Sequence, residues 1–160
     1  MNRIVLAGCG GMASVWVEYA LSRGDCVIVA CVDKMREAAE ALIARCGLAC
    51  PAYTDLEEAI RASGANLVFN VTPPAVHFDV AAAAMRLGCD VMGEKPLAET
   101  LEQAKGIIEI SDRTGRFCAV MQNRRYHPQI RAFRRLLAEG AVGKTGYIGA
   151  DFFLGPHFGG

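Results

Sequence analysis

Residues 94–96, Glu94-Lys95-Pro96, place a carboxylate beside an ammonium, after a short apolar run that starts at Val91 and stops at Gly93. Proline has no N–H for a sheet hydrogen bond, so a strand over 89–92 has to end before it. If the strands are parallel, Lys95 follows a carboxyl end, where ligands of such sheets bind. Its ammonium could stabilise a substrate oxygen as hydride leaves the adjoining carbon, with Glu94 orienting it or balancing its charge. A solvated loop pair is an equally good interpretation of these residues alone.

A second stretch, 8–13, reads Gly-Cys-Gly-Gly-Met-Ala and has the pattern G-x-G-x-x-A between an expected strand and an expected helix. In such a turn the first glycine permits the tight bend, and the second lets the backbone approach a pyrophosphate. The final small residue lets the helix pack closely on the sheet. A helix N-terminus also favours phosphate. We therefore expect a dinucleotide to be bound by Gly8, Gly10, Gly11, Met12 and Ala13.

Asp33 ends the second expected strand, 25 residues after Gly8. A carboxylate at this place suits both adenosine ribose hydroxyls, which favours NAD over NADP. The neighbouring cation Lys34 could receive a 2′-phosphate and leaves NADP open. Two other interpretations are a glycine turn with a helix-capping aspartate, and a methyltransferase, which would give Glu94-Lys95-Pro96 no role.

These residues need a scaffold, and short apolar runs alternate with helical periodicity along most of the chain. Strands are expected over 3–7, 26–32, 49–52, 66–71, 89–92 and 117–121. Helices are expected between them, with Thr54 and Glu57 forming a capping box at one N-terminus. This alternation predicts an α/β fold, a doubly wound parallel sheet of the Rossmann type.

The pattern changes after Met121. A polar stretch at 123–128 precedes a helix, and a strand is expected over roughly 145–154. We therefore expect a dinucleotide-binding domain over 1–122, and over 123–160 the first helix and strand of an incomplete α+β domain. A lone strand is not stable without a partner, so the chain is interpreted as truncated.

Charge and cysteine usage narrow the partners. Lys+Arg and Asp+Glu number 17 each, so no strong field attracts nucleic acid or an anionic membrane. The five arginines within 124–135 are interpreted as a solvated or interdomain face. The seven cysteines are scattered without a C-x-x-C pair, which indicates neither a disulfide framework nor a metal site and favours the cytoplasm. No run is long enough to span a membrane.

Five motifs in order carry a resemblance to a known family: AGCGGMA at 7–13, VD at 32–33, NVTPPAVH at 70–77, GEKPLA at 93–98 and QNRRYHP at 122–128. The chain resembles the N-terminal part of the Gfo/Idh/MocA oxidoreductases, which include glucose–fructose oxidoreductase and inositol dehydrogenase. The resemblance implies an NAD(P)-dependent dehydrogenase acting on a sugar, polyol or related alcohol.

The resemblance also implies roles for single residues. Lys95 would be the catalytic residue beside nicotinamide and the substrate hydroxyl, often with a cis bond to Pro96. Arg124 matches a position that meets substrate in some relatives. For His77 a cap or packing role is slightly favoured over catalysis. Besides the glycine turn and Asp33-Lys34, the residues expected near the cofactor are Asn70, Thr72, Pro73, His77, Glu94 and Lys95.

Family members carry a further Asp and His, one helical turn apart, in a second domain, where the histidine commonly handles the alcohol proton. No Asp-x-x-x-His occurs in this chain. We therefore expect the cofactor-binding portion of a dehydrogenase, inactive alone and homo-oligomeric in its full-length form. The alternative is a stand-alone NAD(P)-binding or interaction module without catalysis.

Overall fold

The computed structural model describes residues 1–151 of the 160-residue chain. The chain divides into two compact units, Met1–Met121 and Gln122–Gly160. The first contains a six-stranded parallel sheet with helices on both faces, which confirms the predicted fold class. Its strands are β1 (Asn2–Ala7), β2 (Cys26–Val32), β3 (Ala52–Tyr53), β4 (Leu67–Asn70), β5 (Asp90–Gly93) and β6 (Cys118–Val120).

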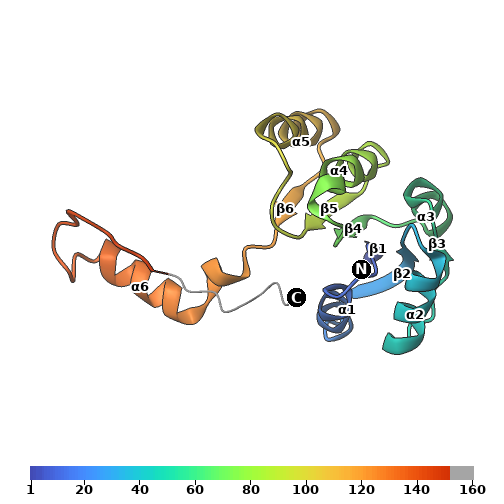
Figure 1. The fold of residues 1–160 in the computed structure, drawn as a ribbon, viewed down its shortest axis with the longest axis horizontal. Coiled ribbons are helices and arrows are strands. Elements are labelled where there is room, and N and C mark those ends of the chain that lie inside the picture. Colours follow the sequence, from blue (N-terminus) through green and yellow to red (C-terminus); the bar gives the residue numbers. More distant parts are fainter. Residues whose placement is uncertain (152–160) are drawn as a thin grey trace, which may run out of the picture. The chain divides into compact units, whose positions relative to one another are not determined.

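The strand order is β3-β2-β1-β4-β5-β6, so the winding reverses between β1 and β4 (Figure 1). The helices are α1 (Ala13–Leu21), α2 (Arg36–Cys46), α3 (Leu56–Ser63), α4 (His77–Arg86) and α5 (Leu101–Thr114), with a 3-10 turn η1 (Pro74–Val76) before α4. The reversal creates the crevice in which ligands of such sheets bind.

Two apolar clusters hold the layers together. Buried side chains of α1 and α2, among them Trp16 and Leu42, pack on one face of the sheet. Those of α3, α4 and α5, among them Met85 and Ile107, pack on the other face. The strands between them are apolar on both sides, as expected for a parallel sheet covered by helices.

The start of α3 differs from the prediction. Its N-cap is Asp55, whose side chain accepts a hydrogen bond from the Glu58 N–H at 2.7 Å, and not Thr54. Asp55 and Glu58 have the same i, i+3 spacing as Thr54 and Glu57, so the sequence pattern alone fits both. A complete capping box occurs instead at Thr100 and Gln103, where α5 begins.

The second unit contains a 3-10 turn η2 (Asn123–Tyr126) and helix α6 (Pro128–Ala138). The apolar side chains of α6 are about half exposed, with Ile130 at 49% and Phe133 at 55%. The strand expected over 145–154 is absent from residues 145–151, and 152–154 lie outside the described residues. A strand needs a paired neighbour, and residues 122–151 provide none.

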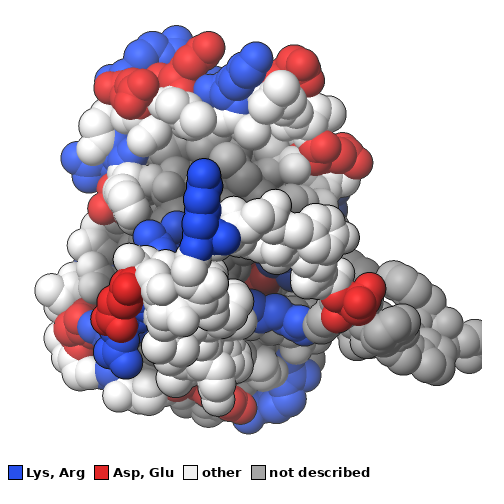
Figure 2. All heavy atoms as spheres, turned by 90° about the vertical axis from the view of Figure 1, so that its left-hand side faces the viewer, with Lys and Arg blue, Asp and Glu red and all other residues white. Residues whose placement is uncertain are grey.

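Figure 2 shows Lys and Arg side chains interspersed with Asp and Glu over the face in view. This mixture agrees with the zero formal net charge of the chain. Within residues 1–151, no helix is long and apolar enough to cross a lipid bilayer.

Candidate functional site

The strand register brings most candidate residues to one edge of the sheet. Ala7 of β1 pairs with Val32 of β2 and with Asn70 of β4, and Asn70 pairs with Gly93 of β5. The residues that follow these four are Gly8, Asp33, Val71 and Glu94. They therefore lie at the carboxyl ends of neighbouring parallel strands, across the point where the winding reverses.

The glycine turn after β1 has two kinds of glycine. Gly8 has a φ of 91°, and a Cβ there would lie 2.6 Å from the carbonyl of Val71, so only glycine fits. A Cβ on Gly10 or Gly11 would meet no protein atom within 4 Å. The exposed side of the turn is therefore open, which leaves room for a group to approach the backbone closely.

The turn leads directly into α1. Met12 is the N-cap, and no side chain caps this helix. Ala13 is fully buried against the sheet, as the small residue of the motif requires. A helix N-terminus without a side-chain cap keeps its partial positive charge available for an anion.

Asp33 is tied to the glycine turn by its carboxylate. The Cys9 N–H donates to Oδ2 at 2.8 Å, and the Met35 N–H donates to Oδ1 at 3.0 Å. The N-cap of α2 is Met35, so Asp33 is not the capping aspartate of the alternative interpretation. Each carboxylate oxygen accepts more than one hydrogen bond, so Asp33 can hold the turn and still accept from a ligand. Lys34 beside it is exposed.

The turn after β4 is held together by buried Asn70. Its amide Nδ2 donates to the carbonyl of His77 at 3.0 Å, and its Oδ1 accepts from the Thr72 hydroxyl at 2.6 Å. Asn70 is 2% exposed, so its side chain shapes the turn and presents little surface. Pro73 is exposed at the N-cap of η1.

His77 connects this turn with the one after β5. Its Nδ1 lies 2.7 Å from the carbonyl oxygen of Pro96, and its Nε2 lies 2.7 Å from the carbonyl oxygen of Thr72. The side chain is 2% exposed. Both ring nitrogens are thus engaged with backbone, and the geometry fits a packing residue better than a proton-transfer group.

The Lys95-Pro96 peptide bond is cis. The Glu94 carboxylate does not pair with the ammonium of Lys95. Its Oε1 accepts from the indole N–H of Trp16 at 2.9 Å, and its Oε2 accepts from the backbone N–H of Lys95 at 3.2 Å. Lys95 is exposed, and its ammonium has no hydrogen bond or ion pair within residues 1–151. It is therefore free to meet a ligand at this edge.

The contact between Trp16 and Glu94 has no signature in the sequence spacing, because 78 residues separate the two. The one available signal is chemical: a buried indole N–H needs an acceptor. The contact joins α1, which follows the glycine turn, to the end of β5. It thereby couples the two halves of the sheet across the crevice.

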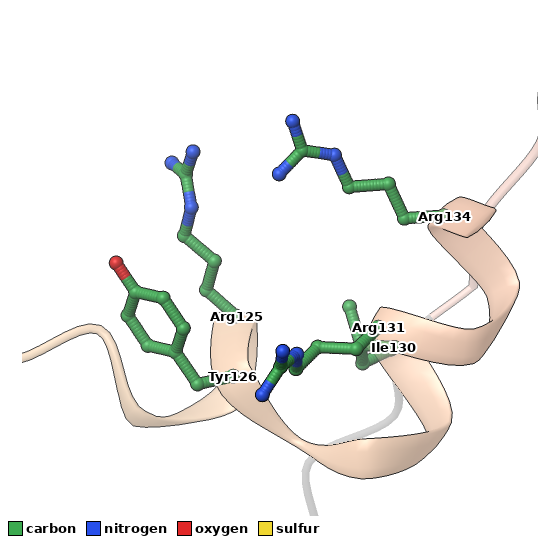
Figure 3. A pocket seen from close by; sticks show the side chains of 5 residues that line it. All are labelled: Arg125, Tyr126, Ile130, Arg131 and Arg134. Atoms are coloured by element: carbon green, nitrogen blue, oxygen red, sulfur yellow. The ribbon is translucent and has the colours of Figure 1, made fainter. Parts of the chain in front are cut away.

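Arg124 belongs to the second unit and is exposed. In the same unit, η2 and α6 form an open hollow of about 570 Å³. Figure 3 shows Arg125 and Arg134 extending on the same side of the ribbon, with Tyr126 beside Arg125. The guanidinium groups of Arg125, Arg131 and Arg134 make the hollow basic. Among the described residues, no group of three or more His, Cys, Asp and Glu is arranged to hold a metal ion.

Comparison with known proteins finds a family whose sequence model matches this chain. The Gfo/Idh/MocA family model, described as an oxidoreductase family with an NAD-binding Rossmann fold, matches residues 2–122. The chain is 32% identical over 126 residues to 4-carboxy-2-hydroxymuconate-6-semialdehyde dehydrogenase of Sphingobium sp., covering 79% of the chain and 40% of the relative. It is 30% identical over 161 residues to 1,5-anhydro-D-fructose reductase of Ensifer adhaerens, covering 98% and 47%.

A solved structure agrees with these relatives. GenD2 from gentamicin A biosynthesis, solved in complex with NAD, matches with a TM-score of 0.81 and 25% identity, over 88% of this chain and 40% of that one. The chain thus spans less than half the length of each of these three proteins.

Proposed function

Because the chain belongs to the Gfo/Idh/MocA oxidoreductase family, we propose that it is the coenzyme-binding part of an NAD(P)-dependent dehydrogenase or reductase. The reaction would move hydride between nicotinamide and a secondary alcohol carbon of a sugar, a polyol or a related compound. The observation that carries the proposal is the row of Gly8, Asp33 and Glu94 at one sheet edge, with exposed Lys95 next in the chain.

The residues present fit a dinucleotide. Gly10 and Gly11 would receive the pyrophosphate, because no protein atom occupies the space in front of their backbone. A side chain at either position would fill that space and keep the phosphates away from the backbone. The α1 N-terminus would add its partial positive charge. Asp33 would accept from the ribose hydroxyls at the adenosine end, which favours NAD, with Lys34 leaving NADP possible. When bound, the coenzyme supplies the hydride acceptor or donor.

Lys95 would hold the substrate. Its ammonium would donate to the reacting hydroxyl and stabilise the negative charge that grows on that oxygen as the C–H bond weakens. Glu94 would orient Lys95, because its carboxylate joins the Lys95 backbone N–H to the indole N–H of Trp16. Thr72 and Pro73 would line the site, and buried Asn70 and His77 would hold that turn in shape behind them. Arg124 would contact substrate.

The names of two relatives support a substrate with a carbonyl or alcohol group and do not identify the compound. One relative is a reductase of a sugar derivative, and another is a dehydrogenase of a semialdehyde. A sugar or polyol is therefore the substrate class we propose for the whole protein, and assembly of full-length chains as a homo-oligomer stays a prediction.

A binding module without catalysis is the second candidate. The observation that favours it is His77, the single histidine of residues 1–121, whose ring nitrogens both face backbone carbonyls. No imidazole of this unit is then available to move the alcohol proton. Oxidation of sugars and polyols with NAD by a full-length form of the protein, followed by NADH absorbance, separates the two candidates: turnover that falls in Lys95→Met favours the enzyme, and no turnover by a folded full-length form favours the binding module.

The proposal is tested by titrating the protein with NADH and then NADPH while following the fluorescence of Trp16, the single tryptophan. Saturable quenching with NADH bound more tightly is expected. Absence of binding by either coenzyme, in protein shown to be folded by circular dichroism, would overturn the coenzyme site.

Two variants resolve the adenosine end. Asp33→Asn keeps an acceptor for the Cys9 N–H but loses the charge, and it should weaken NADH binding more than NADPH binding. The matched control Lys34→Ala changes the adjacent exposed side chain and should leave NADH binding unaltered. Equal losses for both coenzymes in Asp33→Asn would remove the ribose role of Asp33.

A further inference from the structure

Two cysteines outside the proposed coenzyme site face each other. Cys31 of β2 is fully buried, and Cys50, in the loop before β3, is half-buried. Their Sγ atoms lie 3.9 Å apart, within the same apolar cluster on the α1 and α2 face of the sheet. All seven cysteines are free thiols in the structure.

The sheet holds the two backbones side by side. The Cys31 N–H donates to the carbonyl of Pro51, the residue after Cys50, at 3.1 Å. One residue further, Ala52 pairs with Cys31 in the parallel ladder. The thiols are therefore adjacent because β2 and β3 pair, and a small side-chain rotation would bring the sulfurs together.

The pair is chemically asymmetric. A hydrogen bond from Cys31 lowers the pKa of the Cys50 thiol, whereas the pKa of Cys31 is raised by its hydrogen bonds with Cys50 and Cys9 and by burial. Burial instead raises the pKa of Cys89 and Cys118. The thiolate is the form that reacts with oxidants, and Cys50 is also the member of the pair that solvent reaches.

We propose that Cys50 and Cys31 form a reversible redox modification site, in which Cys50 is oxidised by a peroxide and Cys31 resolves it to a disulfide. The Cys50 thiolate attacks one peroxide oxygen; the S–O bond forms, the O–O bond breaks, and hydroxide leaves as water after protonation. Cys31 then loses its proton and attacks Sγ of Cys50; the S–S bond forms, the S–O bond breaks, and the oxygen leaves as a second water. The two sulfurs supply the two electrons, and a thiol reductant reverses the change.

The test adds hydrogen peroxide to the reduced 160-residue protein at neutral pH and measures intact mass before and after. A loss of two hydrogen atoms, reversed by dithiothreitol, is expected. Trypsin alone cannot locate the bond, because the peptide 24–34 holds both Cys26 and Cys31 and the peptide 46–61 holds both Cys46 and Cys50. The matched control is therefore Cys26→Ser with Cys46→Ser, which should still link the two peptides.

Two further variants separate the steps. In Cys31→Ala the link should disappear, and dimedone should label Cys50, since its sulfenic acid has no resolving thiol. Cys50→Ser, at a half-buried loop position, should leave both peptides unlinked and Cys31 unlabelled even if Cys31→Ala does not fold. Persistence of the link in Cys50→Ser, or its absence from the Cys26→Ser, Cys46→Ser control, would overturn the proposal.

Discussion

Individual polar side chains hold the carboxyl edge of the sheet in shape. His77 spans the turns after β4 and β5, Asn70 closes the first of these turns, and Glu94 reaches back to α1 through Trp16. The Asn70–His77 and His77–Thr72 contacts are local and shape one turn, whereas the His77–Pro96 and Trp16–Glu94 contacts join segments 19 and 78 residues apart and fix one candidate site segment relative to another. Lys95 owes its position to this frame and not to a charged partner.

At this scale we predict that His77→Phe lowers stability by about 1–3 kcal/mol, because a buried backbone carbonyl loses the imidazole N–H that donates to it. Urea unfolding followed by circular dichroism measures the change. His77→Gln retains an amide donor and should recover part of the loss. NADH affinity should fall in His77→Phe as the Thr72 and Pro96 turns separate. Wild-type stability in His77→Phe would show that the two contacts contribute nothing.

At the scale of elements, the glycine turn before α1 separates folding from binding. Gly8 has a positive φ and no room for a Cβ, whereas a Cβ on Gly10 would meet no protein atom within 4 Å. Glycine is therefore needed at Gly8 for the fold of the turn, and at Gly10 for the close approach of the expected ligand.

The contrast predicts opposite phenotypes for two alanine variants. Gly8→Ala should lower stability by about 1–3 kcal/mol or more. The new Cβ would clash with backbone atoms of Val71, which cannot move aside as a flexible side chain could. Gly10→Ala should leave stability within about 0.5 kcal/mol but weaken NADH about tenfold or more, or about 1.4 kcal/mol. Thermal unfolding and Trp16 titration measure the two effects; a Gly10→Ala protein with normal NADH affinity would contradict the expected approach of the pyrophosphate.

The α3 cap gives a second element-scale prediction. Asp55→Ala should cost about 1 kcal/mol, since the Glu58 N–H loses its acceptor. Thr54→Ala, one residue earlier and exposed, serves as the control and should stay within about 0.5 kcal/mol. Equal losses in urea unfolding would show that both side chains share the cap.

The sequence predicts elements well where a pattern is local. Apolar runs and glycine stops locate five of the six strands to within one residue at each end, and the glycine turn, Asp33 and Lys95 follow strand ends as expected. The α3 cap could not be chosen, because Thr54 and Asp55 both fit the spacing. The strand expected over 49–52 forms instead at Ala52–Tyr53, since pairing with β2 decides its extent. The Trp16–Glu94 contact depends on the folded sheet.

At the scale of the whole chain, the first unit has its own core. Every buried residue that the structure describes lies between Ile4 and Ile110. In contrast, α6 has no buried residue. The family match ends at residue 122, one residue after the boundary between the units.

We therefore predict that residues 1–122 alone retain the thermal midpoint and the NADH affinity of the 160-residue protein. Removing α6 also removes its half-exposed apolar side chains, so the shorter chain should associate less at high concentration. Calorimetry, coenzyme titration and light scattering compare the two. A shorter chain that unfolds would show that the core needs residues beyond 122.

The indole of Trp16 has one more consequence. Because the chain has a single tryptophan, a nitrogen-15 spectrum contains one indole signal, which needs no assignment. The indole N–H donates to Oε1 of Glu94 with an N–O distance of 2.9 Å, and Trp16 is 6% exposed. The indole proton should therefore resonate downfield and exchange slowly with deuterium. That one resonance reports whether α1 and the end of β5 stay joined while coenzyme, peroxide or pH is varied.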